Sequence, residues 1–464
     1  MPEFHTLSAT ELTEGLRAQR WSSEALTRHF LERIERLNPQ LHAVHFVYKD
    51  AVAQAKKIDQ RRQQGESLPP LAGLPMTLKD AFAIKGKRST YGALPYAYHT
   101  PKKDAACVAS LKRAGVVIMG RSAVPTGSFD WNCRNQLFAE CVHPEHPEFS
   151  PGGSSGGAAS ALGAGLTPLE LGSDLGGSIR YPAHCCGLYG LRTSEGWIPF
   201  ADVGPDGQGS FAHVGVCGPM SRHIEDLSLI TERFARDFPD SRLRTPEPKA
   251  TLRIAYSAGV GNVPADAATT AHLDTFIKQL RARGHRCEQI SPELDIAALN
   301  QTFGHVVGYQ YQTMYPAWIP NRLKQQALDQ LLFQKVGAGW MRDSVLKGLM
   351  SSQADFLQHL ARVRSAQHVM DRFFNTYDMW ILPVSPGPTR KRSESGHMMD
   401  THAGPMSYSD FISSYLCSTA LLGTPALSVP VGRDENDLPI GLQIHGPRFG
   451  DLALLHQFSH NLGF

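Results

Sequence analysis

The chain has 464 residues, 42% of them hydrophobic and 19% charged, which is enough apolar sequence to bury a large core. The formal net charge is +3, so the composition gives no electrostatic footprint for nucleic acid or for an anionic membrane surface. No stretch approaches about 18 consecutive apolar residues and the N-terminal segment lacks a signal region, so we expect no membrane anchor and a cytoplasmic protein.

Cysteine and histidine usage indicates no metal centre. The 8 cysteines are scattered without a C-x-x-C pair, which predicts buried, reduced thiols rather than a disulfide framework or a zinc site. His143 and His146 lie in a segment broken by prolines, so they cannot share one face of a helix, and we expect a loop there. We therefore expect neither a metal nor a cofactor.

The first part of the chain predicts an N-terminal helical region, residues 1–65. The segment Ser8–Glu11 matches a capping box that opens a helix. A second helix is predicted from about Ser22 to Arg36, with its apolar residues on one face, and a third near Asp50 to Gln63.

Residues 66–200 are predicted to form the catalytic core. The apolar run Leu71–Leu78 predicts a strand or extended segment that carries Lys79 into the interior. A helix over Ala105–Ala114 followed by a short buried strand over Val116–Met119 predicts alternating helices and strands.

Two glycine-serine clusters follow a loop-like segment, Phe129–Pro151. The first is GGSSGG at 152–157 and the second is GSDLGGSIR at 172–180, with small-residue helices predicted after each. Glycine allows positive φ and lets backbone amides approach a ligand closely. Acyl transfer needs a nucleophile beside donors aimed at the developing oxyanion, and Ser178 directly follows such a run of amides.

The chain beyond the clusters predicts further α/β structure. Ser221 is predicted to cap a helix, Leu252–Tyr256 to form a strand and Asp266–Arg283 to form a helix. The region at about 295–375 is predicted to be helical and to lie on the substrate side, either as core or as the lining of an apolar channel. Its aromatic residues are Phe303, Tyr309, Tyr311, Tyr315, Trp318 and Trp340.

The C-terminal segment predicts a strand, a rim loop and a hairpin. Tyr377–Val384 is the predicted strand, and the residues at about 385–406 form the predicted loop at the edge of an active site. Ala426–Val431 and Gly441–His445 are predicted to pair across a tight turn, and Leu452–Leu462 to form the last helix.

Three motifs resemble those of the amidase signature family. They are G-[IL]-P-x-x-x-K-D at 73–80, GGSSGG at 152–157 and GSDLGGSIRYP at 172–182, and two C-terminal phrases at 424–432 and 438–447 also match. The resemblance spans nearly the whole chain. It implies one α/β domain over residues 1–464, a large mixed β-sheet surrounded by helices, and dimers occur in the family, so a homodimer is compatible with it.

The resemblance also implies a Ser-cisSer-Lys triad, with a cis peptide at Gly153–Ser154. Carried over position by position, the triad is Lys79, Ser154 and Ser178, with Ser154 and not Ser155 at the family spacing. A serine hydroxyl needs a base, and burial lowers the pKa of a lysine enough for its neutral form to act as one. Ser154 then relays the proton from Ser178 to Lys79.

The remaining site residues are interpreted either as hydrogen-bond donors to the oxyanion or as side chains that position the catalytic serines. The candidates for the oxyanion hole are the N–H groups of Leu175, Gly176, Gly177 and Ser178. The candidates for positioning are Ser155, Asp174 and Arg180, although the last two also suit turn residues that satisfy the backbone.

The resulting hypothesis is an amidohydrolase that cleaves a linear carboxamide of a small molecule to an acid and ammonia or an amine, through a Ser178 acyl-enzyme. The alternative within the family is the glutaminase subunit of a tRNA-dependent amidotransferase, although that branch typically has Gln where this chain has Tyr181. A catalytically dead binding protein is disfavoured by the intact triad. Fatty-amide hydrolases of the family would need an N-terminal membrane anchor, which we do not expect.

Two other motif matches are disfavoured by their context. Gly152-x-Ser154-x-Gly156 matches the nucleophile elbow of α/β-hydrolases, but a strand must precede that elbow and a proline-rich segment precedes this one. The run from Gly172 to Ser178 imitates a P-loop but lacks the lysine that touches phosphates, so nucleotide binding is poorly supported.

Overall fold

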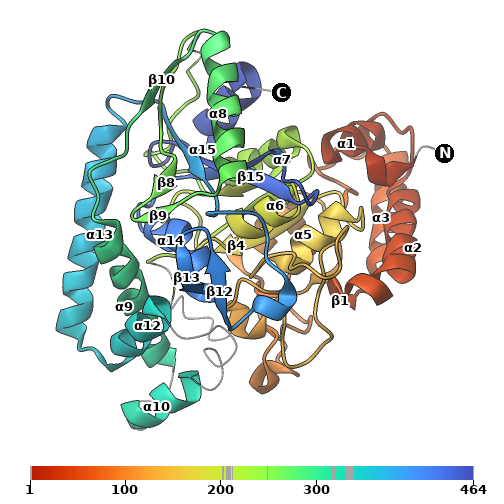
Figure 1. Cartoon of the computed structure of the whole chain (residues 1–464). Coiled ribbons are helices and arrows are strands. Elements are labelled where there is room, and N and C mark those ends of the chain that lie inside the picture. Colours follow the sequence, from red (N-terminus) through yellow and green to blue (C-terminus); the bar gives the residue numbers. More distant parts are fainter. Residues whose placement is uncertain are drawn as a thin grey trace.

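Two β-sheets form the centre of the molecule and helices surround them (Figure 1). The computed structural model describes residues 3–200, 203–204, 211, 213–247, 249–314, 319–329 and 339–462. The N-terminal helices lie at one side of the sheets, and α9, α12 and α13 lie at the opposite side (Figure 1). No helix among the described residues combines the length and the hydrophobicity that crossing a bilayer requires.

The larger sheet is mixed. Within the described residues it has eight strands, in the spatial order β10-β7-β11-β15-β14-β5-β6-β4. β7 pairs in parallel with β10 and β11, and all other neighbours are antiparallel. The predicted large mixed sheet surrounded by helices is therefore confirmed. The strands are β4 (Glu170–Asp174), β5 (Tyr189–Arg192), β6 (Val216–Ser221), β7 (Arg253–Tyr256), β10 (Arg286–Gln289), β11 (Met379–Pro383), β14 (Ala426–Arg433) and β15 (Pro439–His445).

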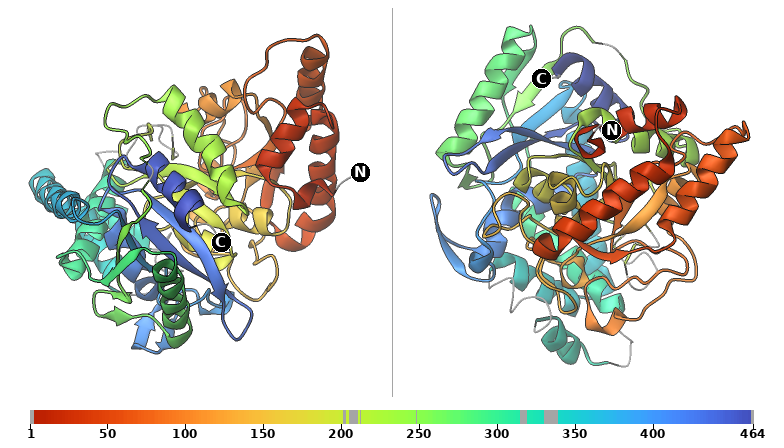
Figure 2. Two further views of the ribbon diagram at one scale, coloured as in Figure 1. Left: turned by 90° about the horizontal axis from the view of Figure 1, so that it is seen from above. Right: turned by 90° about the vertical axis from the view of Figure 1, so that its right-hand side faces the viewer.

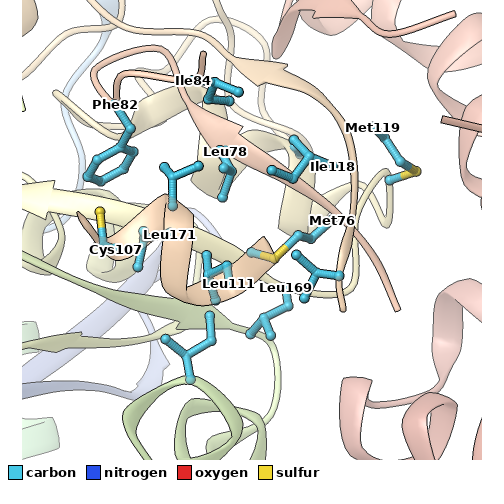
Figure 3. Close-up of a cluster of buried hydrophobic side chains, with 14 of the residues drawn as sticks. Met76, Leu78, Phe82, Ile84, Cys107, Leu111, Ile118, Met119, Leu169 and Leu171 are labelled. Atoms are coloured by element: carbon cyan, nitrogen blue, oxygen red, sulfur yellow. The ribbon is translucent and has the colours of Figure 1, made fainter. Parts of the chain in front are cut away.

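The smaller sheet carries Lys79 into the interior. It has the order β1-β3-β2, formed by β1 (Val44–Val47), β3 (Val117–Ser122) and β2 (Pro75–Lys79). β2 and β3 are parallel and buried along their whole length. Because side chains alternate along a strand, Met76 and Leu78 enter the apolar cluster shown in Figure 3 while Thr77 and Lys79 point to the other side. The predicted extended segment is confirmed, although its strand begins only at Pro75.

The N-terminal helices follow the prediction closely. They are α1 (Ala9–Arg17), α2 (Ser23–Leu41) and α3 (Ala51–Gln63), and they pack together beside the sheets (Figure 2). The Ser8 hydroxyl and the Glu11 carboxylate form the expected capping box. α2 continues past the predicted end to Leu41, with Pro39 inside its last turn, where only the final residues of the helix follow the missing N–H.

Further helices cover the sheets. They are α4 (Ala106–Arg113), α5 (Gly156–Gly163), α6 (Arg180–Cys185), α7 (Ile224–Asp237), α8 (Ala267–Ala282), α14 (Tyr408–Ala420) and α15 (Asp451–Gln457), which continues as a π-helix over Phe458–Leu462. Two small ribbons complete the described strands: β8 (Gly259–Val260) with β9 (Val263–Pro264), and β12 (Met398–Thr401) with β13 (Gly404–Ser407).

The region at about 295–375 is helical, as predicted. It contains α9 (Ile296–Met314), α10 (Asn321–Leu328), α12 (Trp340–Met350) and α13 (Gln353–Phe373). Glycines let α9 and α12 cross in close contact, since a Cβ on Gly308 would lie 2.0 Å from the Val345 carbonyl oxygen. Of the aromatic residues, Phe303 and Tyr311 are buried, and Tyr315 and Trp318 lie outside the described residues.

Two predicted elements differ in the structure. Ser221 does not cap a helix: it ends β6, because the residues before it pair with β4, and α7 begins only at Ile224. The segment at about 385–406 is not one continuous loop, because β12 and β13 form a hairpin within it. In addition, β4 was not predicted, since glycine and few β-branched residues give that strand a weak sequence signal.

Asp226 connects the N-terminal helices to α7. Its buried carboxylate accepts hydrogen bonds from the backbone N–H groups of Ala9 and Thr10, at 2.9 and 2.8 Å, and from the Ser221 hydroxyl. We predict that Asp226→Ala lowers the free energy of unfolding by about 2–4 kcal/mol, because it leaves several buried donors without an acceptor. Urea denaturation measures the change. Asp295→Ala, which removes an exposed cap of the Ala298 N–H, is the matched control and should cost only about 1 kcal/mol; equal losses would contradict the prediction.

Candidate active site

Lys79 ends β2 in a fully buried position between the two glycine-serine clusters. Its Nζ lies 2.7 Å from Ser154 Oγ in the first cluster. It also donates to Ser173 Oγ at 2.9 Å and to the Ser173 carbonyl oxygen at 3.3 Å. The structure therefore brings two of the three predicted triad residues into direct contact.

These three oxygens can accept the three N–H donors of a charged lysine, and they also accommodate the neutral amine. A neutral lysine has two N–H donors and one lone pair, and Ser173 supplies two acceptor oxygens for the donors. The lone pair is then free to accept the hydroxyl proton of Ser154. Burial lowers the pKa of Lys79 from 10.5 to about 7, and the nearby Asp174, Cys133 and Glu170 oppose that shift. The lowered pKa therefore favours the neutral form of Lys79 at a pH where an exposed lysine is fully charged.

The sequence did not predict that Ser173 contacts Lys79. Ser173 lies in the second cluster, but its side chain reaches Lys79 only because β4 runs beside β2. Leu171 and Ser173 lie two residues apart and share one face of β4, but the strand itself was not predicted.

The second serine of the first cluster fastens the loop of Ser178. The Ser155 N–H donates to the Ser178 carbonyl oxygen at 3.2 Å, and the Ser155 hydroxyl donates to the Ser173 carbonyl oxygen at 3.4 Å. The Gly153–Ser154 peptide is cis, as the resemblance implied. Ser155 thus holds the two clusters together, while Ser178 is 9% exposed at the edge of a cavity.

The backbone amides before Ser178 divide into two groups. The Gly177 N–H donates to Asp174 Oδ1 at 2.8 Å, so it is occupied by a protein acceptor. The N–H groups of Leu175, Gly176 and Ser178 have no acceptor among the described residues, and these three stay candidates for an oxyanion hole. Gly177 has a φ of +101°, which brings it against Leu416 at a distance that no Cβ would allow.

Asp174 and Arg180 form a buried ion pair beneath this loop. Arg180 Nε and Nη2 each lie 3.1 Å from a carboxylate oxygen of Asp174, and Arg192 lies 3.6 Å away on another side. These guanidinium groups hold the pKa of the Asp174 carboxyl well below its usual range despite its burial. Arg180 Nη1 also donates to Thr419 Oγ1 and to Gln443 Oε1, which ties the loop to α14 and β15.

A buried carboxyl group lies close to Lys79. Glu170 accepts a hydrogen bond from the Thr77 hydroxyl at 2.5 Å, and burial raises the pKa of Glu170 to about 8. The group is therefore mostly protonated at pH 7, so it adds little negative charge that would stabilise a protonated Lys79.

The cavity at Ser178 is narrow and mostly apolar. It is lined by Leu175, Gly176 and Ser178 of the second cluster, by residues 128–131, and by Phe303 of α9 and Met341 of α12. Its volume is about 30 Å³, room for roughly one water, so any larger ligand requires side chains of the lining to move. The close crossing of α9 and α12 therefore helps to shape the site.

The described residues contain no group of three or more His, Cys, Asp and Glu side chains able to hold a metal ion. His143 and His146 lie in a loop, as predicted, and His143 Nε2 contacts the Cys185 carbonyl oxygen. All eight cysteines are free thiols, and all except the half-buried Cys287 are buried.

Comparison with known proteins assigns this arrangement to a family. A family model described as Amidase matches residues 25–455. An indoleacetamide hydrolase of Bradyrhizobium diazoefficiens is 27% identical over 96% of this chain and 84% of its own length. A glutamyl-tRNA(Gln) amidotransferase subunit of Acinetobacter baumannii is also 27% identical, over 99% of this chain and 97% of its own length. A solved bacterial aryl acylamidase, 22% identical, has the same fold, with a TM-score of 0.81 over 98% of this chain and 95% of that chain.

The lowered pKa of Lys79 predicts a specific dependence of stability on pH. Between about pH 7 and its usual value of 10.5, the unfolded chain binds a proton at Lys79 that the folded protein does not. Raising the pH through this window should therefore stabilise the wild type relative to Lys79→Met, by about 1.4 kcal/mol per pH unit. Urea denaturation of both proteins at pH 7.5, 8.5 and 9.5 measures the difference; parallel pH profiles would mean that the folded protein keeps Lys79 charged.

Proposed function

This chain belongs to the amidase signature family, and from that premise we propose that it hydrolyses a linear carboxamide to an acid and ammonia or an amine. The observation that carries the proposal is the buried amine of Lys79, 2.7 Å from Ser154 Oγ and beside the loop of Ser178. The relatives named for indoleacetamide and aryl acylamide hydrolysis support small-molecule amides as the substrate class.

In the proposed first half-reaction, Ser178 Oγ attacks the amide carbonyl carbon. Ser154 takes the proton from Ser178 while it gives its own proton to neutral Lys79. The free N–H groups of Leu175, Gly176 and Ser178 stabilise the oxyanion that forms on the carbonyl oxygen. Removing one such donor typically costs about a hundred- to a thousandfold in rate.

The leaving nitrogen must be protonated, because an amide anion is a poor leaving group. Protonated Lys79 returns its proton through Ser154 to the nitrogen, the carbon–nitrogen bond breaks, and the acyl group stays on Ser178. In the second half-reaction water attacks the ester carbonyl and the same relay takes and returns a proton, which releases the acid and restores Ser178. The route serves esters as well as amides.

In this proposal, the loop of Ser178 is held in position by Asp174, Arg180 and Ser155. The Asp174 carboxylate accepts the Gly177 N–H and pairs with Arg180, so the loop that carries Ser178 and the free amides keeps one conformation. None of these three side chains is required to exchange a proton with the substrate.

A second proposed function is that of the glutaminase component in an amidotransferase complex. The amidotransferase relative from Acinetobacter baumannii is as similar in sequence as the hydrolase relative. Both functions use the same triad, so partner dependence and glutamine turnover separate them. We favour the stand-alone hydrolase because Tyr181 occupies the position after the S-I-R motif.

We predict that Ser178→Ala lowers kcat by at least about 10⁴-fold and abolishes the covalent acyl-enzyme. Lys79→Ala should be comparably damaging, since it removes the base. Ser154→Ala should cost roughly 10²- to 10⁴-fold, because water can replace a proton relay in part. Mass spectrometry of the intact protein and its peptides, quenched during turnover, locates the acyl group.

Ser128→Ala is the matched control, because Ser128 lines the same cavity and makes no contact with Lys79. It should keep kcat within about tenfold of the wild type. An acyl group found on Ser155 or on a cysteine, or substantial activity of Lys79→Ala near neutral pH, would overturn the assignment of the triad.

A panel of aliphatic, aryl, peptide-terminal and urea-like amides, with glutamine included, tests the choice between the two functions. The purified chain alone should release ammonia or amine together with the acid from at least one of these amides, with kcat/KM at least about tenfold above that for glutamine, because a substrate-matched cavity discriminates at that level. Ammonia released from glutamine alone, and only when a partner protein is added, would favour the glutaminase function instead.

A further inference from the structure

Outside the glycine-rich loop, the cavity is lined by aromatic residues and by one acidic residue. Phe129, Trp131 and Phe303 supply the rings. Among the described residues that line the cavity, Asp130 is the only ionisable one. A carboxylate beside aromatic faces is the combination that binds an organic cation, because the carboxylate supplies charge and the rings supply cation–π attraction.

Backbone packing places Asp130 close to the reacting groups. A Cβ on Gly153, the residue before Ser154, would lie 2.5 Å from the Asp130 carbonyl oxygen, so the two backbones are in direct contact. The next residue, Trp131, donates its indole N–H to the Gly176 carbonyl oxygen at 3.0 Å. Asp130 is thus fastened between the two clusters on which the proposed chemistry depends.

The carboxyl group of Asp130 is only partly used by the protein. Oδ1 accepts the Asn132 N–H at 3.1 Å, which orders the turn. No salt bridge of Asp130 is found among the described residues, although Arg134 is near enough to oppose the rise in the pKa of this carboxyl. The residue is half-buried, and a carboxylate in such a place gains a strong interaction when a cationic ligand arrives.

We propose that this cavity takes amides that carry a protonated amine near the scissile carbonyl, and that Asp130 binds the ammonium group. The inference rests on the proposed amidase function of the same cavity and narrows its substrate class. The amine of the substrate places a cation beside this carboxylate, and the aromatic residues exclude water from the pair. The carbonyl carbon then lies next to Ser178, which lines the same cavity.

Because Asp130 titrates, the preference for amino amides should depend on pH. Burial raises the pKa of Asp130 to about 7, and the neighbouring Glu140 adds to the rise, while Arg134 and the hydrogen bonds of the turn oppose it. The phenol of Tyr408 is the other titratable group that faces it. The carboxyl is charged above its pKa, so the preference for an amine should weaken as the pH falls below about 7.

The test compares amino amides with neutral amides of the same shape. The pairs are glycinamide with propanamide, 4-aminobutanamide with pentanamide, and 6-aminohexanamide with heptanamide. For at least one pair, wild-type kcat/KM at pH 8 should be roughly ten- to a hundredfold higher for the amino amide. This is the gain expected from one charge-assisted hydrogen bond. In Asp130→Asn, which keeps the Oδ1 acceptor for the turn, that ratio should fall to within about threefold of one.

Asp50→Asn is the matched control, because it removes the same charge from a surface position whose side chain is 50% exposed. It should leave the ratio unchanged, which excludes a general effect of net charge. Binding to Ser178→Ala by calorimetry, with and without Asp130→Asn, gives a readout that needs no turnover.

The outcomes separate the two proposals. Hydrolysis of neutral and amino amides at equal kcat/KM would overturn the inference and leave the amidase function intact. Binding of an amino amide that depends on Asp130, without hydrolysis of any amide, would support the inference and contradict the proposed function. A Ser178→Ala protein that binds neither member of any pair, or binds both equally, would also overturn the inference.

Discussion

The exclusion of one amine from water is the constraint on which the site depends. The proposed role of Lys79 as a base near neutral pH requires that burial keep its pKa near 7. β2 and β3 supply that burial from one side and β4 from the other, and Ser173 and Ser154 supply the hydrogen bonds that an amine cannot then find in solvent. The apolar cluster around Met76 and Leu78 (Figure 3) keeps the strand in place.

A second buried interaction fixes the loop that carries Ser178. Desolvating Asp174, Arg180 and Arg192 is costly, so these charges are stable only because each is paired and hydrogen-bonded. Arg180 reaches Gln443 of β15 and Thr419 of α14, which are distant in sequence. The C-terminal strands therefore support a loop that lies in the first half of the chain, and this explains why both halves carry motifs of one family.

Much of the candidate site was predictable, because its residues lie in short motifs with unusual glycine content. Lys79, Ser154 and Ser178 were named from those motifs, and the structure places Lys79 against Ser154. Ser173 escaped because its role depends on β4 lying beside β2, and no local pattern announced β4. The occupied amide of Gly177 escaped because it depends on the rotamer of Asp174, which Arg180 sets.

The sequence by itself determined the local features: the capping box at Ser8, the hairpin of β14 and β15, the amphipathic helices and the family motifs. These follow from interactions between residues near one another in the chain. Only the tertiary structure decided the protonation of Lys79, the order of the strands and the wall formed by Asp130, Trp131 and Phe303. Those features arise where segments distant in the sequence remove water from the same small volume, and burial of that kind leaves no local pattern.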